Sequence, residues 1–251
     1  MRVMMAFSDS HFRRRRFNGS GPVERLLILV VVAAVVGVTI GLLLPKISHP
    51  VGELTGEYVA SGPAADALNG LSVDDHPSVA GYNREDFGYN QMDIGGSGCD
   101  AREHVLARDL NDVTYRHRGS CQVASGVLHD PYTGKTIHFL RGKNTSQNVQ
   151  IDHVVALQNA WQSGARHWST AKRYQYGNDM YNLLAVDGPS NEQKGSASAA
   201  YWLPANGAFR CQYVARQIGV KEKYGLSVPS PEQRALRAVL HGCPAQEVPK
   251  R

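Results

Sequence analysis

Three short stretches of the sequence contain side chains that could cooperate in breaking a phosphodiester bond. They are Asp152-His153, then Asn182, and then the segment that runs from Asn191 to Lys194. Asn191 follows Asn182 by nine positions, and Lys194 follows Asn191 by three. A strand, a turn and a helix of these lengths would fold the carboxylate, the imidazole and the second asparagine toward one point.

These residue types suit hydrolysis assisted by one metal ion. Asp152 offers an anionic oxygen and Asn191 a neutral amide oxygen, which are ligands that Mg²⁺ accepts together with water. His153 follows Asp152 directly, so on a strand it faces the other way and stays free to act as a general base. Lys194 would add positive charge near a phosphate. Because both expected ligands are oxygens, Mg²⁺ or Mn²⁺ is expected rather than Zn²⁺.

The local patterns predict the elements that must position these residues. Residues 149–155 and 182–186 are predicted to be strands, and residues 191–201 a helix with Ser190 as a candidate cap. Residues 122–128 and 135–140 flank the turn sequence HDPYTG and predict a β-hairpin.

The remaining periodic segments predict helices. A helical spacing of apolar residues over 100–113, with Asp100 as N-cap, predicts one helix before the hairpin. Further helices are predicted at 157–163, 170–176, 211–224 and 231–240. The fold class is therefore α+β, with a small antiparallel sheet and several helices.

An apolar run at residues 26–44, LLILVVVAAVVGVTIGLLL, has the length and composition of a membrane span. Arg13 to Arg16 and Arg25 lie on its N-terminal side, which predicts a cytoplasmic N-terminus and an extracytoplasmic remainder. The alternative is a cleaved secretory signal, which would leave the protein secreted. The predicted organisation is a basic cytoplasmic tail (1–25), a transmembrane anchor (26–44), a flexible linker (45–78) and one extracytoplasmic domain (79–251).

The charge is unevenly distributed along the chain. The formal net charge is +5, but residues 45–251 hold 21 basic and 20 acidic residues. The high isoelectric point therefore belongs to the N-terminal segment and is no sign of a basic face on the domain. The composition itself excludes wholesale disorder, collagen and a coiled coil.

Four cysteines, Cys99, Cys121, Cys211 and Cys243, all follow the apolar run and form no CxxC pair. In an exported domain they predict two disulfides rather than a zinc site. Three pairings are possible. We favour Cys99–Cys121 with Cys211–Cys243, since each closes a local loop, and each would stabilise the fold by about 3–4 kcal/mol.

Several longer blocks resemble a known family. VQIDHVVALQNAW, YNLLAVDGPSNEQKG and AAYWLP resemble the HNH (ββα-metal) endonucleases, and more narrowly the GmrSD-like C-terminal HNH domain of secreted or anchored bacterial proteins. GCDAREHVLARDL, CQVASGVLHDPYTG and RCQYVARQIGVKEKYGL extend the resemblance over residues 82–243. The resemblance implies a ββα-metal core with added helices.

The resemblance also implies a role for each residue of the motif. His153 corresponds to the general base and Asp152 to the first metal ligand. Asn182 corresponds to the asparagine that braces the loop carrying the base. Asn191 corresponds to the second metal ligand, and Lys194 to the basic residue near the phosphate. The 29 positions from His153 to Asn182 exceed the compact motif and imply an inserted helical excursion.

The expected function is therefore metal-dependent cleavage of nucleic acid, DNA rather than RNA, outside the cytoplasm. The membrane is an expected partner through the apolar run, and protein partners stay open. The alternative is an inactive module on the same fold that binds nucleic acid or a cell-envelope polymer, which the nearly neutral domain favours. An envelope hydrolase lacks support, because the sequence has neither HExxH nor GxSxG.

Overall fold

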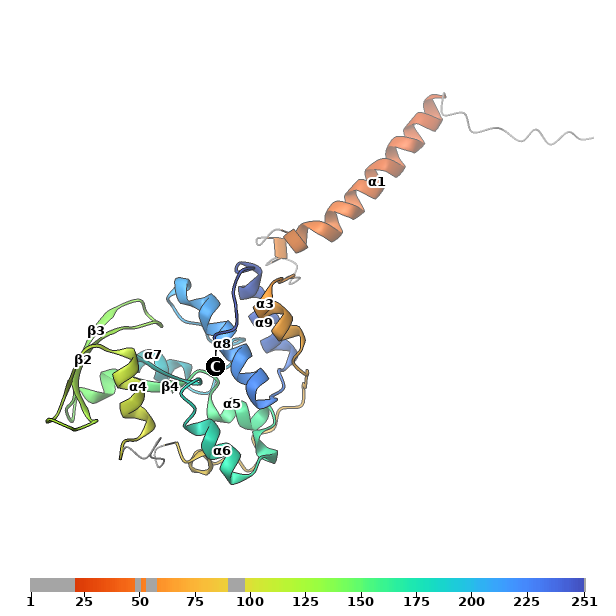
Figure 1. Cartoon of the computed structure of the whole chain (residues 1–251). Coiled ribbons are helices and arrows are strands. Elements are labelled where there is room, and N and C mark those ends of the chain that lie inside the picture. Colours follow the sequence, from red (N-terminus) through yellow and green to blue (C-terminus); the bar gives the residue numbers. More distant parts are fainter. Residues whose placement is uncertain (1–20, 48–50, 53–57, 90–97, 251) are drawn as a thin grey trace, which may run out of the picture. The chain divides into compact units, whose positions relative to one another are not determined.

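The computed structural model describes residues 21–47, 51–52, 58–89 and 98–250. The chain divides into two compact units, Met1–Thr55 and Gly56–Arg251. Figure 1 shows both units, coloured along the sequence.

The first unit contains helix α1 (Pro22–Ile47), which includes the predicted span. Its Pro22–Leu44 portion has a mean hydropathy of 3.1 and no buried residues. By length and composition this helix could cross a membrane. The predicted basic tail lies largely outside the described residues.

The second unit begins earlier than predicted. Helix α3 (Pro63–Asn69) lies inside the expected linker and packs against α8 (Arg210–Tyr224) and α9 (Ser230–His241). Its Ala64, Ala65 and Leu68 are buried. A linker throughout 45–78 was therefore a wrong prediction, because small apolar residues at helical spacing form a face that the C-terminal helices cover.

The predicted hairpin is confirmed as part of a three-stranded antiparallel sheet. Its strands are β1 (Asn111–Tyr115), β2 (Val123–His129) and β3 (Thr136–Leu140), in that order. Helix α4 (Ala101–Asp109) precedes them and is capped by the Asp100 side chain, as predicted. The helix ends before residue 113, because Asn111–Tyr115 pairs with β2 instead.

A second antiparallel sheet consists of β4 (Val149–His153) and β5 (Leu183–Asp187), and α7 (Gly188–Lys194) follows it directly. The helix predicted at 191–201 with a Ser190 cap is shifted. The Asp187 carboxylate accepts the Ser190 N–H and starts the helix earlier, and Gly195 with a φ of 51° follows its last residue.

The excursion between β4 and β5 contains α5 (Leu157–Gln162), the 3₁₀ turn η3 (Ala165–His167) and α6 (Thr170–Gly177). Helix α6 packs against η1 (Arg84–Phe87). A Cβ on Gly177 would lie 2.3 Å from the Phe87 carbonyl oxygen, so only glycine permits this approach. The turns η2 (Ser146–Asn148) and η4 (Gly207–Phe209) complete the unit.

The core of this unit consists of three apolar clusters. One joins α3, α8 and α9 to the strand pair β4–β5. The second lies under the excursion, and the third lies between α4 and the two sheets. All three clusters include residues from β4, β5 or the segment just after β4, so the core supports the strand pair on several sides.

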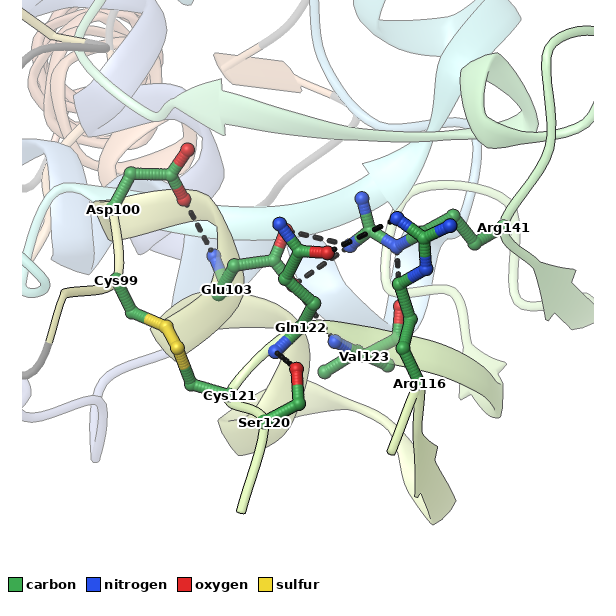
Figure 2. Close-up of a disulfide and its surroundings, with 9 residues drawn as sticks. All are labelled: Cys99, Asp100, Glu103, Arg116, Ser120, Cys121, Gln122, Val123 and Arg141. Carbon is green, nitrogen blue, oxygen red and sulfur yellow. Dashed lines mark hydrogen bonds and ion pairs between the residues drawn. A yellow bond between two sulfur atoms is a disulfide. The ribbon is translucent and has the colours of Figure 1, made fainter. Parts of the chain in front are cut away.

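Both favoured disulfides are confirmed, Cys99–Cys121 and Cys211–Cys243. Figure 2 shows the first, which ties the start of α4 to the segment before β2. Beside it, the buried Glu103 carboxylate accepts the Val123 N–H at 2.8 Å and pairs with Arg141 at 2.6 Å. The second disulfide joins the start of α8 to the residue that follows α9 and its cap.

We predict that Cys211→Ser/Cys243→Ser lowers the free energy of unfolding by about 3–4 kcal/mol, because the unfolded chain regains the entropy of the opened loop. Urea denaturation of the full chain in detergent, followed by tryptophan fluorescence, measures this, since all three tryptophans lie beyond residue 160. The prediction is contradicted if the double variant, with its Cys99–Cys121 disulfide intact, has the same denaturation midpoint as the wild-type chain.

Candidate active site

His153 ends strand β4 and is buried, with 6% of its surface exposed. Its Nε2 lies 2.8 Å from the carbonyl oxygen of Gly177, the last residue of α6. A carbonyl oxygen only accepts, so Nε2 carries the proton and Nδ1 keeps its lone pair. Burial lowers the pKa of His153 to about 4, so the imidazole is neutral at pH 7.

Asp152 lies in a buried group of three side chains. The Lys194 ammonium donates to its Oδ1 at 2.8 Å, and the Tyr132 hydroxyl donates to its Oδ2 at 2.5 Å. Lys194 also donates to the His153 carbonyl oxygen at 2.9 Å. Burial raises the pKa of Asp152, while the Lys194 charge and the hydrogen bonds from Lys194 and Tyr132 act in the opposite direction.

Strand alternation explains why neighbouring residues have such different surroundings. Side chains on successive strand positions point to opposite faces. Asp152 is bonded to α7 through Lys194, and His153 is bonded to α6 through Gly177. The excursion is the segment by which this chain is longer than a compact motif. It supplies the only hydrogen bond that the His153 ring makes within the described part of the chain.

Tyr132 comes from the HDPYTG turn, which was predicted only to connect the two strands of the hairpin. The Asp130 carboxylate stabilises this turn by accepting the Thr133 N–H at 2.7 Å. The same carboxylate accepts the Asp187 N–H at 2.9 Å, which ties the turn to the end of β5. Tyr132 is fully buried. An aromatic residue in a polar turn was the available signal for its role.

Asn182 is fully buried and bonded to the segment that follows His153. Its Oδ1 accepts the Val155 N–H at 2.9 Å and its Nδ2 donates to the Val155 carbonyl at 3.1 Å. Its own carbonyl accepts the Val154 N–H at 2.8 Å. The three bonds hold the backbone just beyond His153 in one conformation.

Asn191 lies on α7 and donates through Nδ2 to Gln150 Oε1 at 2.9 Å. Gln150 in turn donates to Glu192 at 2.8 Å. Within the described chain no donor is bonded to the Asn191 Oδ1, which therefore remains the end available to a ligand.

Two cavities meet at His153, Asn191 and Arg84. We name the larger, of about 430 Å³, the catalytic cavity; it is also lined by Asp152. The smaller has a volume of about 300 Å³. The Arg84 guanidinium lies 4.5 Å from the Tyr89 ring centroid and is exposed, which makes it a cation facing both cavities. Arg84 was not among the predicted site residues, because it precedes the motif by many residues and has no local signal.

The donor set does not fit a divalent metal ion while Lys194 occupies its present position. Both oxygens of Asp152 accept hydrogen bonds, and the ammonium already neutralises the carboxylate. Among the described residues there is also no group of three or more His, Cys, Asp or Glu side chains that could hold a metal. Asp152 and Asn191 therefore lack the spare negative charge that holds Mg²⁺ in most protein sites.

Lys194 differs most from its expected surroundings. A position near the phosphate requires an exposed ammonium, but the side chain is completely buried. It lines neither the catalytic cavity nor the smaller one. In this structure its contacts are those of a residue that positions Asp152 and the His153 backbone.

Comparison with known proteins places most of this unit in one family. Residues 100–239 match the family described as GmrSD restriction endonucleases, C-terminal domain. An uncharacterized secreted protein of Arthroderma benhamiae is 38% identical over 186 residues, which is 73% of this chain and 86% of that protein. No solved structure matches the sequence significantly. The family match includes Tyr132, β4, the excursion, β5 and α7, and the chain therefore belongs to the family of GmrSD restriction endonuclease C-terminal domains.

Proposed function

We propose that the unit Gly56–Arg251 is an HNH-type endonuclease, and that β4, β5 and α7 form its ββα core. Membership of a restriction endonuclease family supports a nuclease that hydrolyses nucleic acid. The observation that carries the more specific proposal is the state of His153. It is a neutral imidazole whose Nε2 proton is bound to Gly177 and which lines a cavity beside an exposed arginine.

In the proposed reaction the His153 Nδ1 removes a proton from a water molecule, and the water oxygen attacks phosphorus. The bond from phosphorus to the 3′ oxygen breaks, and this oxygen takes a proton from a second water molecule, which leaves a 5′-phosphate and a 3′-hydroxyl. Arg84 faces the cavity and binds the phosphate, where its charge stabilises the extra negative charge of the transition state. Asn182 keeps the backbone beyond His153 in place.

We predict that His153→Ala lowers the rate of DNA cleavage by about 10²–10⁴-fold, because the variant lacks the group that accepts the proton. The full chain in detergent is incubated with supercoiled plasmid and with circular single-stranded DNA. Circular substrates have no ends, so only an endonuclease cleaves them. His138→Ala is the matched control, since His138 is exposed on β3 and lines neither cavity at the site.

Cleavage that persists in His153→Ala contradicts the assignment of the base.

A second candidate function is the inactive binding module. The occupied oxygens of Asp152 and the nearly neutral charge of residues 45–251 favour it. Binding of both DNA forms without cleavage by the wild-type chain would select that alternative.

Magnesium or manganese as the cofactor, with Asp152 and Asn191 as ligands, stays a prediction. A divalent ion that reaches Asp152 must compete with the Lys194 ammonium for Oδ1, 2.8 Å away. When bound, such an ion would supply positive charge for the phosphate oxygens. The competition can be measured without any assay of activity.

We predict that Lys194→Met increases Mn²⁺ affinity by about tenfold, because the variant removes a cation next to the buried carboxylate. Titration calorimetry on the full chain measures this, and near-UV circular dichroism establishes that the variant is folded. Asp152→Asn is the control and is expected to bind Mn²⁺ less tightly than wild type. Absence of Mn²⁺ binding in both wild type and Lys194→Met contradicts the predicted ligands.

We also propose that α1 is an uncleaved single-pass anchor with the globular unit outside the cytoplasm. The apolar helix, the two disulfides and the secreted relative support an extracytoplasmic location. We predict that the full-length chain sediments with membranes after alkaline carbonate treatment, and that protease added to intact spheroplasts digests the globular unit. A chain shortened by residues 1–44 and released into the medium contradicts the anchor and favours a cleaved signal.

A further inference from the structure

A third cavity, of about 740 Å³, adjoins the catalytic cavity. Its walls come from α5, from the segment 196–201 after α7 and from the start of α9. Gln158 and Ser196 line both this cavity and the catalytic cavity. We name these two adjoining cavities together the extended groove, and His153 lines one part of it.

The lining of the extended groove beyond the catalytic cavity is polar and contains two acids, both of which are held by neighbouring residues. Asp75 accepts two hydrogen bonds from Ser230, both at 2.6 Å. Glu232 is buried and paired with the Lys221 ammonium at 3.2 Å. Amides and hydroxyls supply most of the other polar groups, namely Gln158, Asn159, Gln162, Ser163, Ser196 and Ser198.

Each part of the extended groove contains an exposed arginine. Arg84 lines the catalytic cavity and Arg234 lines the adjoining one. Glu232 is neutralised by Lys221, while the exposed Asp75 keeps its negative charge, so the groove has two guanidiniums against one uncompensated acid and favours an anionic ligand. A phosphate backbone is such a ligand.

Tyr201 adds an aromatic surface to the extended groove. It is 82% exposed, more than any other large hydrophobic side chain in the described part of the chain, and it lines the 740 Å³ cavity. Its backbone is held in place, because Tyr201 and Trp202 both donate to the Ser198 carbonyl. Trp202 packs on Tyr132 with ring centroids 5.0 Å apart, so the Tyr201 ring is carried by a segment anchored to the active site.

We propose that the extended groove binds a single strand of nucleic acid, with one base stacked on Tyr201 and flanking phosphates at Arg84 and Arg234. This inference rests on the proposed nuclease function. In a duplex the bases are already paired and stacked, whereas in a single strand each base offers its face to an aromatic ring. Duplex binding through phosphates also requires many cations, and residues 45–251 hold 21 basic against 20 acidic residues.

The test measures binding by fluorescence anisotropy, with a labelled 20-nucleotide single strand and the same sequence as a duplex. The full chain in detergent carries His153→Ala so that the probes stay intact. We expect the single strand to bind at least about tenfold more tightly than the duplex, and Tyr201→Ala to weaken its binding about tenfold, the loss of one base–aromatic stack. Tyr201→Phe keeps the ring and is expected to bind like its parent. Tyr115→Ala removes an exposed tyrosine on β1 and is the matched control.

Equal or tighter binding of the duplex overturns the inference, as does unchanged single-strand binding in Tyr201→Ala. The proposed function is tested separately with bis(p-nitrophenyl) phosphate, a small diester without a base that could stack on Tyr201. Suppose that hydrolysis of this diester depends on His153, but Tyr201→Ala binds the single strand as tightly as its parent. This pair of results would reject the single-strand site and leave the proposed nuclease function standing. Absence of any His153-dependent hydrolysis would reject the proposed function.

Discussion

The buried pair of Asp152 and Lys194, completed by the Tyr132 hydroxyl, is the interaction on which the rest of the site depends. Its three members come from β4, from α7 and from the turn between β2 and β3. Removing one partner of a buried ion pair destabilises the folded state by about 3–5 kcal/mol. Each of the three elements must therefore pack where its side chain reaches its hydrogen-bond partner in this group. The surrounding interactions serve the same geometry. Asp130 fixes the turn to β5, and Asp187 starts α7 at the position that delivers Lys194 to Asp152.

Much of the secondary structure could be predicted, because short-range patterns determine it. The hairpin around HDPYTG, the strands β4 and β5 and the helices α8 and α9 follow from alternation, turn residues and helical periodicity. The disulfide pairs could also be favoured from loop length alone. The motif stretches were expected to converge, and Asp152 and Lys194 are indeed bonded, while Asn182 is hydrogen-bonded to the two residues that follow His153.

What could not be predicted depends on partners distant in the sequence. Helix α3 looked like a linker because its small apolar face is recognisable only against α8 and α9. Lys194 was expected near the phosphate, since nothing local indicates a buried carboxylate 42 positions earlier. Arg84 reaches the site because η1 packs against α6, and that contact has no counterpart in any local pattern. The roles of these residues in catalysis remain predictions.

The hydrogen bond from His153 to Gly177 has a consequence for how this family can vary. The acceptor is a main-chain carbonyl, so no substitution of a side chain removes it. Within the excursion Gly177 itself is the exception, because a Cβ there would lie 2.3 Å from the Phe87 carbonyl oxygen and displace the acceptor. Elsewhere in the excursion, substitutions that keep its backbone in place leave this contact intact. A change in the number of residues between β4 and β5 is different, because it moves the carbonyl itself. The length of the excursion, more than its composition, is therefore what selection on the imidazole orientation would preserve.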